Sequence, residues 1–170
     1  GGVTTALRWS SGRRWKFDIL AANAEGRDAA FDHVVFGRRS GLGPLGRSVF
    51  RLAATRRLPF GEARFEAGIL QEKDGLLGAR VGGVFGDDLK AVTWYHAGSF
   101  DLAVAGGWRA QGRYAVGVTD ADASGFAGFL TGADDLTSTQ FAFGLYRPGL
   151  LSEGDLFSIS ALQPLRLESG

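Results

Sequence analysis

A strict alternation of apolar and polar residues between positions 108 and 119 predicts a β-strand. The segment reads W-R-A-Q-G-R-Y-A-V-G-V-T, and a period of two assigns successive side chains to opposite faces. Tyr114 and Val116 fall on the apolar face, whereas Arg109 and Arg113 fall on the other. Outer-membrane barrel strands alternate in this way, apolar toward lipid and polar toward the lumen. Half-buried strands of soluble proteins alternate as well, so one strand does not distinguish a membrane barrel from a soluble protein. The question is whether the rest of the chain repeats the pattern.

Similar alternation recurs along the chain, with turn-forming residues between the segments. The expected strands are residues 3–9, 14–22, 29–37, 48–54, 62–70, 77–85, 89–96, 99–105, 108–119, 139–147 and 155–163. Segments 89–96 and 99–105 form either a strand pair or one long strand bent at Gly98. We expect a loop at 120–137. The pattern predicts one all-β domain over residues 1–170, an antiparallel meander of about eight to ten strands that forms a β-barrel or part of one.

Charged and polar residues occupy alternate positions within these strands, where they are expected to share one face of the sheet. The candidate lumen-facing residues are Arg14, Lys16, Asp18, Arg64, Glu66, Arg109, Gln111 and Arg113. In a membrane barrel this face lines a polar lumen, whereas in a soluble barrel or sandwich it points to water. We expect the arginines at 64, 109 and 113 to pair with Glu66 or Asp101.

Aromatic residues lie near the ends of the expected strands, as the aromatic girdles of a membrane barrel would require. These residues are Trp9, Trp15, Trp94, Tyr95, Trp108 and Tyr146. Packing in an ordinary core is the alternative. The exposure of four apolar side chains separates the two hypotheses, because a membrane barrel exposes them and a soluble barrel buries them together. These four are Phe17, Phe65, Val116 and Phe143.

The composition narrows the class of protein. The chain has 27 glycines and 4 prolines, which suits tight turns and crowded strands. A net charge of +1 gives no electrostatic basis for binding nucleic acid. The absence of cysteine excludes disulfides and thiolate chemistry, and the absence of methionine leads us to expect a piece of a longer protein. No run reaches the ~20 apolar residues of a transmembrane helix, so a membrane-spanning form would be a barrel.

The sequence offers little catalytic chemistry. His33 and His96 are its two histidines, both within strand-like runs, and no G-x-S-x-G motif is present. We therefore expect no enzyme activity, no cofactor and no metal. The segment 120–125, D-A-D-A-S-G, resembles the start of a calcium-binding loop, but the twelfth position is Thr131 rather than the bidentate Glu. An acidic, glycine-rich hairpin loop is the interpretation we prefer there.

Four segments together resemble a known family. They are F-E-A-G-I-L-Q-E-K-D-G-L-L-G at 65–78, G-V-F-G at 83–86, A-G-G-W-R-A-Q-G-R-Y-A-V-G-V-T-D-A-D-A-S-G at 105–125, and S-I-S-A-L-Q-P-L-R-L-E-S-G at 158–170. In this order they resemble the C-terminal β-barrel (translocator) region of subtilisin-like autotransporter serine proteases of alphaproteobacteria. The resemblance covers residues 62–170 well and 1–61 loosely, and the Q-P-L-R-L-E-S-G ending is its most specific part.

The resemblance implies a location in the bacterial outer membrane and a non-catalytic role in anchoring or exporting a passenger domain. The implied partners are outer-membrane lipid, the passenger domain and the barrel-assembly machinery. Chains of this family continue with further strands and end in an aromatic residue, whereas this chain stops at Gly170. We therefore expect part of a barrel, with open sheet edges that invite self-association. The alternative is a soluble β-barrel or sandwich that binds a ligand or self-assembles through its edges.

Overall fold

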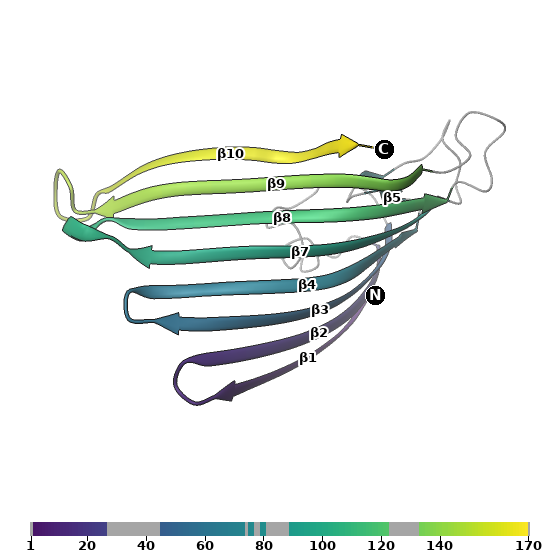
Figure 1. Ribbon diagram of the computed structural model, residues 1–170, viewed down its shortest axis with the longest axis horizontal. Coiled ribbons are helices and arrows are strands. Elements are labelled where there is room, and N and C mark those ends of the chain that lie inside the picture. The colour runs from purple at the N-terminus through teal and green to yellow at the C-terminus, as the bar shows by residue number, and fades with distance from the viewer. Residues whose placement is uncertain are drawn as a thin grey trace.

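The computed structural model describes residues 2–26, 45–73, 75–76, 79–80, 89–122 and 133–169. Eight of its strands form one antiparallel sheet in chain order (Figure 1), which confirms the predicted meander. These strands are β1 (Gly2–Ser11), β2 (Trp15–Gly26), β3 (Leu45–Leu58), β4 (Gly61–Lys73), β7 (Lys90–Ala103), β8 (Arg109–Asp122), β9 (Ala133–Pro148) and β10 (Leu156–Ser169). Strands β5 (Gly75–Leu76) and β6 (Ala79–Arg80) form a separate two-stranded sheet.

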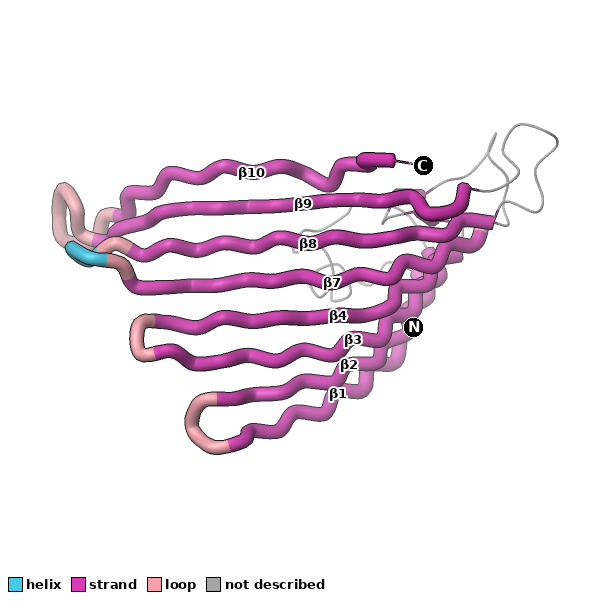
Figure 2. Tube along the Cα trace, viewed as in Figure 1, coloured by secondary structure: helices cyan, strands magenta, loops and turns pink. Residues whose placement is uncertain are grey.

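The two rims of the sheet differ in their connections. Residues 12–14, 59–60, 104–108 and 149–155 make short turns at one rim, on the left in Figure 2. Strands β2, β4 and β8 end at the opposite rim, where longer stretches of sequence separate each of them from the next strand of the sheet. The sheet is not closed: β1 and β10 are its edges, and no pairing joins them in the part of the chain that the structure describes.

The strands are longer than the sequence pattern predicts. β7 runs through Gly98 as one strand, because every residue from Lys90 to Ala103 has a partner on β8. For the same reason β8 and β9 extend into the expected loop at 120–137. Pairing with a neighbour therefore sets the strand ends more than local polarity does. The expected strand 29–37 and most of 77–85 lie outside the described residues.

The two faces of the sheet have opposite character. We call the side that carries Asp18, Glu66 and Arg113 the polar face, and the side that carries Phe65 and Phe143 the apolar face. The buried strand residues, both apolar and charged, belong to the polar face. The sheet curls toward this face, because Leu70 of β4 and Leu165 of β10 line one cavity of about 50 Å³ although three strands separate them.

Small residues make room on the polar face for the long ones. Glu66 pairs with Ala53 on one side and Ala97 on the other. Gly68 lies beneath Tyr95, with which it is paired across β4 and β7. A Cβ atom at this glycine would lie 2.4 Å from the backbone oxygen of Phe50 and 2.8 Å from the Tyr95 hydroxyl. The glycine is therefore required by the close approach of an aromatic ring and a neighbouring backbone.

We expect Gly68→Ala to lower the free energy of unfolding by about 1–3 kcal/mol, because the added methyl overpacks the polar face. Gly144→Ala is the matched control, since its new Cβ would approach its nearest neighbours no closer than an ordinary 3.4 Å. We expect the control to stay within about 0.5 kcal/mol of the parent. Urea unfolding followed by tryptophan fluorescence measures both. Equal losses in the two variants would contradict the overpacking argument.

Asp155 organises the turn between β9 and β10. The backbone N–H groups of Leu151 and Ser152 donate hydrogen bonds of 2.7 and 3.1 Å to its Oδ2 atom. These bonds, led by that from Leu151, hold the pKa of the carboxyl below its ordinary value because they favour the charged form. The turn is thus ordered by an ionised side chain.

We expect the order of this turn to be complete above the ordinary aspartate pKa of about 3.9 and to be lost as the pH falls through the lowered value. NMR amide shifts of Leu151 and Ser152 across a pH titration report the transition. Asp155→Asn should abolish it, since the amide does not ionise. A midpoint at or above the ordinary aspartate value would disprove stabilisation of the carboxylate by these two N–H groups.

Candidate functional site

A single buried carboxylate, that of Glu66, is shared by three arginines on the polar face. Arg64 Nε donates to Glu66 Oε2 at 3.2 Å, and Arg113 Nη2 donates to Oε1 at 3.4 Å. Arg51 Nη1 lies 3.8 Å from Oε2. These groups come from β3, β4 and β8, so the carboxylate joins strands on both sides of its own.

The network continues toward the β1 edge through Asp18. Arg64 Nη1 donates to Asp18 Oδ2 at 3.2 Å and to Thr55 Oγ1 at 3.4 Å. Arg8 of β1 donates to the other oxygen of Asp18. One continuous set of charge-assisted hydrogen bonds therefore spans β1 to β4 and reaches β8.

A second charged cluster lies near the short-turn rim. Arg109 Nη2 donates to Asp101 Oδ1 at 2.7 Å, and Arg109 Nε donates to the Tyr146 hydroxyl at 2.7 Å. Tyr146 in turn donates to Asp101 Oδ2 at 3.2 Å. Together the three residues tie β7, β8 and β9 to one another.

The structure brings most of the predicted site residues onto one face. Those on the polar face are Lys16, Asp18, Arg64, Glu66, Arg109, Gln111 and Arg113. The predicted pairing of the arginines at 64 and 113 with Glu66, and of Arg109 with Asp101, is confirmed. Arg14 was also expected on this face, but it lies in the turn before β2, which begins at Trp15. Gly12, with φ +62°, reverses the chain there, and the Arg14 carbonyl accepts a hydrogen bond from Arg57 N–H.

The sequence interpretation missed one buried ion pair. Arg47 Nε lies 3.3 Å from Glu72 Oε1, and both side chains are almost fully buried. The expected strands stopped at 48–54 and 62–70, just short of both residues. Extending the alternation by one residue at the start of β3 and two at the end of β4 would have placed this pair on the polar face.

The three arginines around Glu66 also enclose a hollow of about 350 Å³. Ala97, Gly98 and Ser99 of β7 form its floor. The guanidinium groups of Arg51, Arg64 and Arg113 and the carboxylate of Glu66 stand around it. The arrangement combines a small-residue floor with a predominantly positive wall.

The apolar face exposes large side chains in the middle of the sheet. Phe65, Trp94 and Phe143 are 52%, 58% and 45% exposed. Phe17 and Val116, on the same face, are half-buried, and Phe17 stacks on Trp9 and Trp15. The four side chains named as a test are therefore not buried together in a core.

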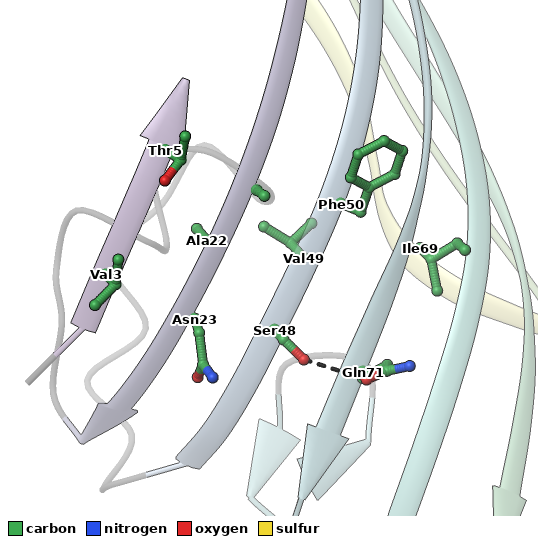
Figure 3. Close-up of a pocket in the computed structure, with 10 residues that line it drawn as sticks. Val3, Thr5, Ala22, Asn23, Ser48, Val49, Phe50, Ile69 and Gln71 are labelled. Atoms are coloured by element: carbon green, nitrogen blue, oxygen red, sulfur yellow. Dashed lines mark hydrogen bonds between the residues drawn. The ribbon is translucent and has the colours of Figure 1, made fainter. Parts of the chain in front are cut away.

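A shallow hollow of about 360 Å³ interrupts this face over β1 to β4 (Figure 3). Phe50 and Ile69 project beside it. Asn23, Ser48 and Gln71 lie in one row at its polar end, where Ser48 Oγ donates to Gln71 Oε1 at 3.3 Å. In this region the apolar face therefore changes from apolar to polar side chains along the strands.

Only some of the aromatic residues expected near strand ends are found there. Trp9, Trp15 and Trp108 lie at the short-turn rim, where Trp108 packs edge-on against Phe157 at 5.9 Å. Tyr146 lies near this rim but on the polar face. Trp94 and Tyr95 are well inside β7 rather than near its end, because β7 continues to Ala103.

Within the described residues, no three His, Cys, Asp or Glu side chains are grouped to hold a metal ion. His96 lies on the apolar face beside Phe65 and Tyr114. His33 and the second half of the 120–125 motif lie outside the described residues. No helix in the described part of the chain is both long and apolar enough to span a membrane. Comparisons with family models, curated proteins and solved structures found no match to the chain.

We expect Glu66→Gln to lower the free energy of unfolding by about 3 kcal/mol, because three guanidinium groups then lose their common counter-charge. Glu168→Gln is the control, since Glu168 is an exposed carboxylate that pairs with Arg166 alone among the described basic residues. A surface pair of this kind contributes about 1 kcal/mol or less. Urea unfolding compares the two, and similar small losses would show that Glu66 does not organise the polar face.

Proposed function

We propose that this chain is part of a transmembrane β-barrel of the bacterial outer membrane, of the autotransporter translocator type. It anchors or exports a passenger and carries no catalysis of its own. The observation that carries the proposal is the distribution of side chains between the two faces. Large apolar residues are exposed on one face, and an ion-paired network occupies the other.

The apolar face favours a lipid environment. Exposed apolar surface is unfavourable in water by roughly 25 cal/mol per Å², so a soluble sheet gains by covering such residues. Phe65 and Trp94 lie on the central strands β4 and β7, whereas Phe143 lies on β9, beside the edge strand β10, and no described element covers any of the three. Hydrocarbon removes this penalty, because a barrel strand presents its apolar side chains to lipid.

The strand lengths fit a membrane span. Strands β3, β7, β8 and β10 each have 14 residues. At a rise of about 3.4 Å per residue and a tilt of about 45°, such a strand covers about 34 Å along the membrane normal. This exceeds the apolar band of about 25 Å and leaves both strand ends in the interfaces.

The lengths of the turns at the two rims favour one orientation of the barrel in the membrane. Outer-membrane barrels have short turns on the periplasmic side and longer loops outside. The short turns at 12–14 and 59–60 therefore point to the periplasm in this proposal. Trp9, Trp15 and Trp108 lie at this rim, at the depth where tryptophan favours the interface.

Passenger export requires a wider barrel than these eight strands can make. A closed barrel of about eight strands is filled by its own side chains. Further strands pairing with β1 and β10 would both widen the lumen and satisfy the two open edges. Insertion of such a barrel would be the task of the barrel-assembly machinery.

A soluble protein that self-assembles through its sheet edges is the second candidate. It is favoured by the exposed apolar residues on the edge strands, Leu7 of β1 and Ile159 of β10, each 62% exposed. Pairing between copies would extend the sheet and cover both edges. This alternative leaves the apolar residues of the central strands without a covering partner.

We expect Trp94 to be quenched by brominated lipid when the chain is folded into bilayers. A single-tryptophan variant, with Trp9, Trp15 and Trp108 changed to Phe, isolates its fluorescence. The matched control changes Trp94→Phe and Tyr95→Trp in the same background, so the probe moves by one residue to the polar face. Quenching should be strong in the first variant and weak in the control.

Equal quenching of both probes, or none of either, would contradict the proposal. Size-exclusion chromatography of the unmodified chain supplies a second readout. The membrane proposal expects a monodisperse folded species only in detergent. A compact or edge-assembled species without detergent favours the soluble alternative.

A further inference from the structure

The hollow beside Glu66 has the features of a binding site for an anion. Its floor consists of small residues of β7, Ala97 to Ser99, which leave about 350 Å³ of space above the sheet. Its walls carry three guanidinium groups and one carboxylate. This volume is within the range of small-molecule sites.

The strand register explains why the arginines converge there. Arg64 and Arg113 are both paired with Ser99, from its two sides, so their side chains stand over the same short residue. Arg51 lies on the neighbouring strand β3, opposite Gly68 and four residues from Thr55, which is the partner of Arg64. All three arginines therefore line the hollow over these small residues.

The charges around the hollow do not balance. In the three rows of paired residues that contain it, basic groups outnumber acidic ones. The basic residues are Arg8, Lys16, Arg51, Arg64 and Arg113, and the acidic residues are Asp18 and Glu66. The next row toward the short turns adds Arg57, Glu62 and Asp101, and Asp101 is engaged by Arg109. A further anion in the hollow would reduce the mutual repulsion of the guanidinium groups.

Two of the three arginines that line the hollow are partly exposed. The side chains of Arg64 and Arg113 are 29% and 41% exposed even though both contact Glu66. A phosphate group presents oxygens in several directions, which suits three converging guanidinium groups better than a planar carboxylate does.

We propose that this hollow binds an oxyanion, and that a phosphate group is the ligand class it takes. The phosphate is either free inorganic phosphate or the terminal group of a phosphate monoester, for whose organic part the hollow has room. The proposal is independent of whether lipid covers the apolar face, because the hollow belongs to the polar face alone.

Isothermal titration of the full folded chain with inorganic phosphate, at constant ionic strength in chloride, tests the proposal. The chain is held in non-ionic detergent, or in plain buffer if it is monodisperse there. We expect saturable binding at one site per chain. Glycerol phosphate, titrated in parallel, distinguishes the sources: tighter binding of the monoester indicates a ligand-borne phosphate, and tighter binding of inorganic phosphate indicates the free ion. Absence of saturable binding for both overturns the proposal.

Charge variants give opposite expected signs, which a merely structural role would not produce. Arg113→Gln should weaken phosphate binding about tenfold, because it removes a charge-assisted donor. Glu66→Gln should strengthen binding, because the competing carboxylate is removed, even though it lowers stability. Arg166→Gln carries the same charge change on the far face of β10 and should leave binding unchanged.

Ser99→Val provides a test that does not alter charge. The larger side chain occupies the floor between Arg64 and Arg113 and should abolish binding while far-UV circular dichroism stays that of the parent. Ser99→Val also tests the proposal if either charge variant fails to fold. Unchanged phosphate affinity in Ser99→Val, or equal loss in Arg166→Gln and Arg113→Gln, would place the binding outside the hollow.

Discussion

The polar face is organised around one carboxylate. Glu66 is nearly buried, yet it contacts three arginines from three strands, and one of these, Arg64, passes the connection on to Asp18. A buried charge is tolerated only when it is paired and hydrogen-bonded, so the burial of this carboxylate depends on the arginines around it. The side-chain network therefore connects strands that are not adjacent, whereas backbone hydrogen bonds connect only neighbouring strands.

The same arrangement depends on what stands beside the charged groups. Alanines flank Glu66 in its row, and Gly68 lies under Tyr95 in the next. With larger residues at these positions the long side chains could not lie across the sheet toward one another. The many glycines and alanines of these strands therefore complement the arginines, since small and charged residues alternate within the same rows of the polar face.

Much of this could be read from the sequence, because a period of two assigns every strand residue to a face once a single register is known. That reasoning placed Arg64, Glu66 and Arg113 together. It missed the pair between Arg47 and Glu72, whose strands were drawn too short. Strand ends depend on partners far away in the chain, so local polarity underestimates them, as the continuous pairing of β7 past Gly98 illustrates. The hollow was missed for a related reason, since its lining residues come from four strands that are brought into register only in the folded sheet.

The two faces impose incompatible demands on their surroundings. Moving the Glu66 network into hydrocarbon would leave its charges without solvent screening, whereas placing Trp94 and Phe143 in water leaves large apolar areas uncovered. A sheet that separates a polar interior from an apolar exterior satisfies both, provided its edges are paired. The backbone hydrogen-bonding groups along the open edges of β1 and β10 then still need partners. A barrel completed by additional strands and surrounded by lipid, as proposed, would meet this demand and that of the apolar face together, whereas edge pairing between soluble copies would leave the apolar face uncovered.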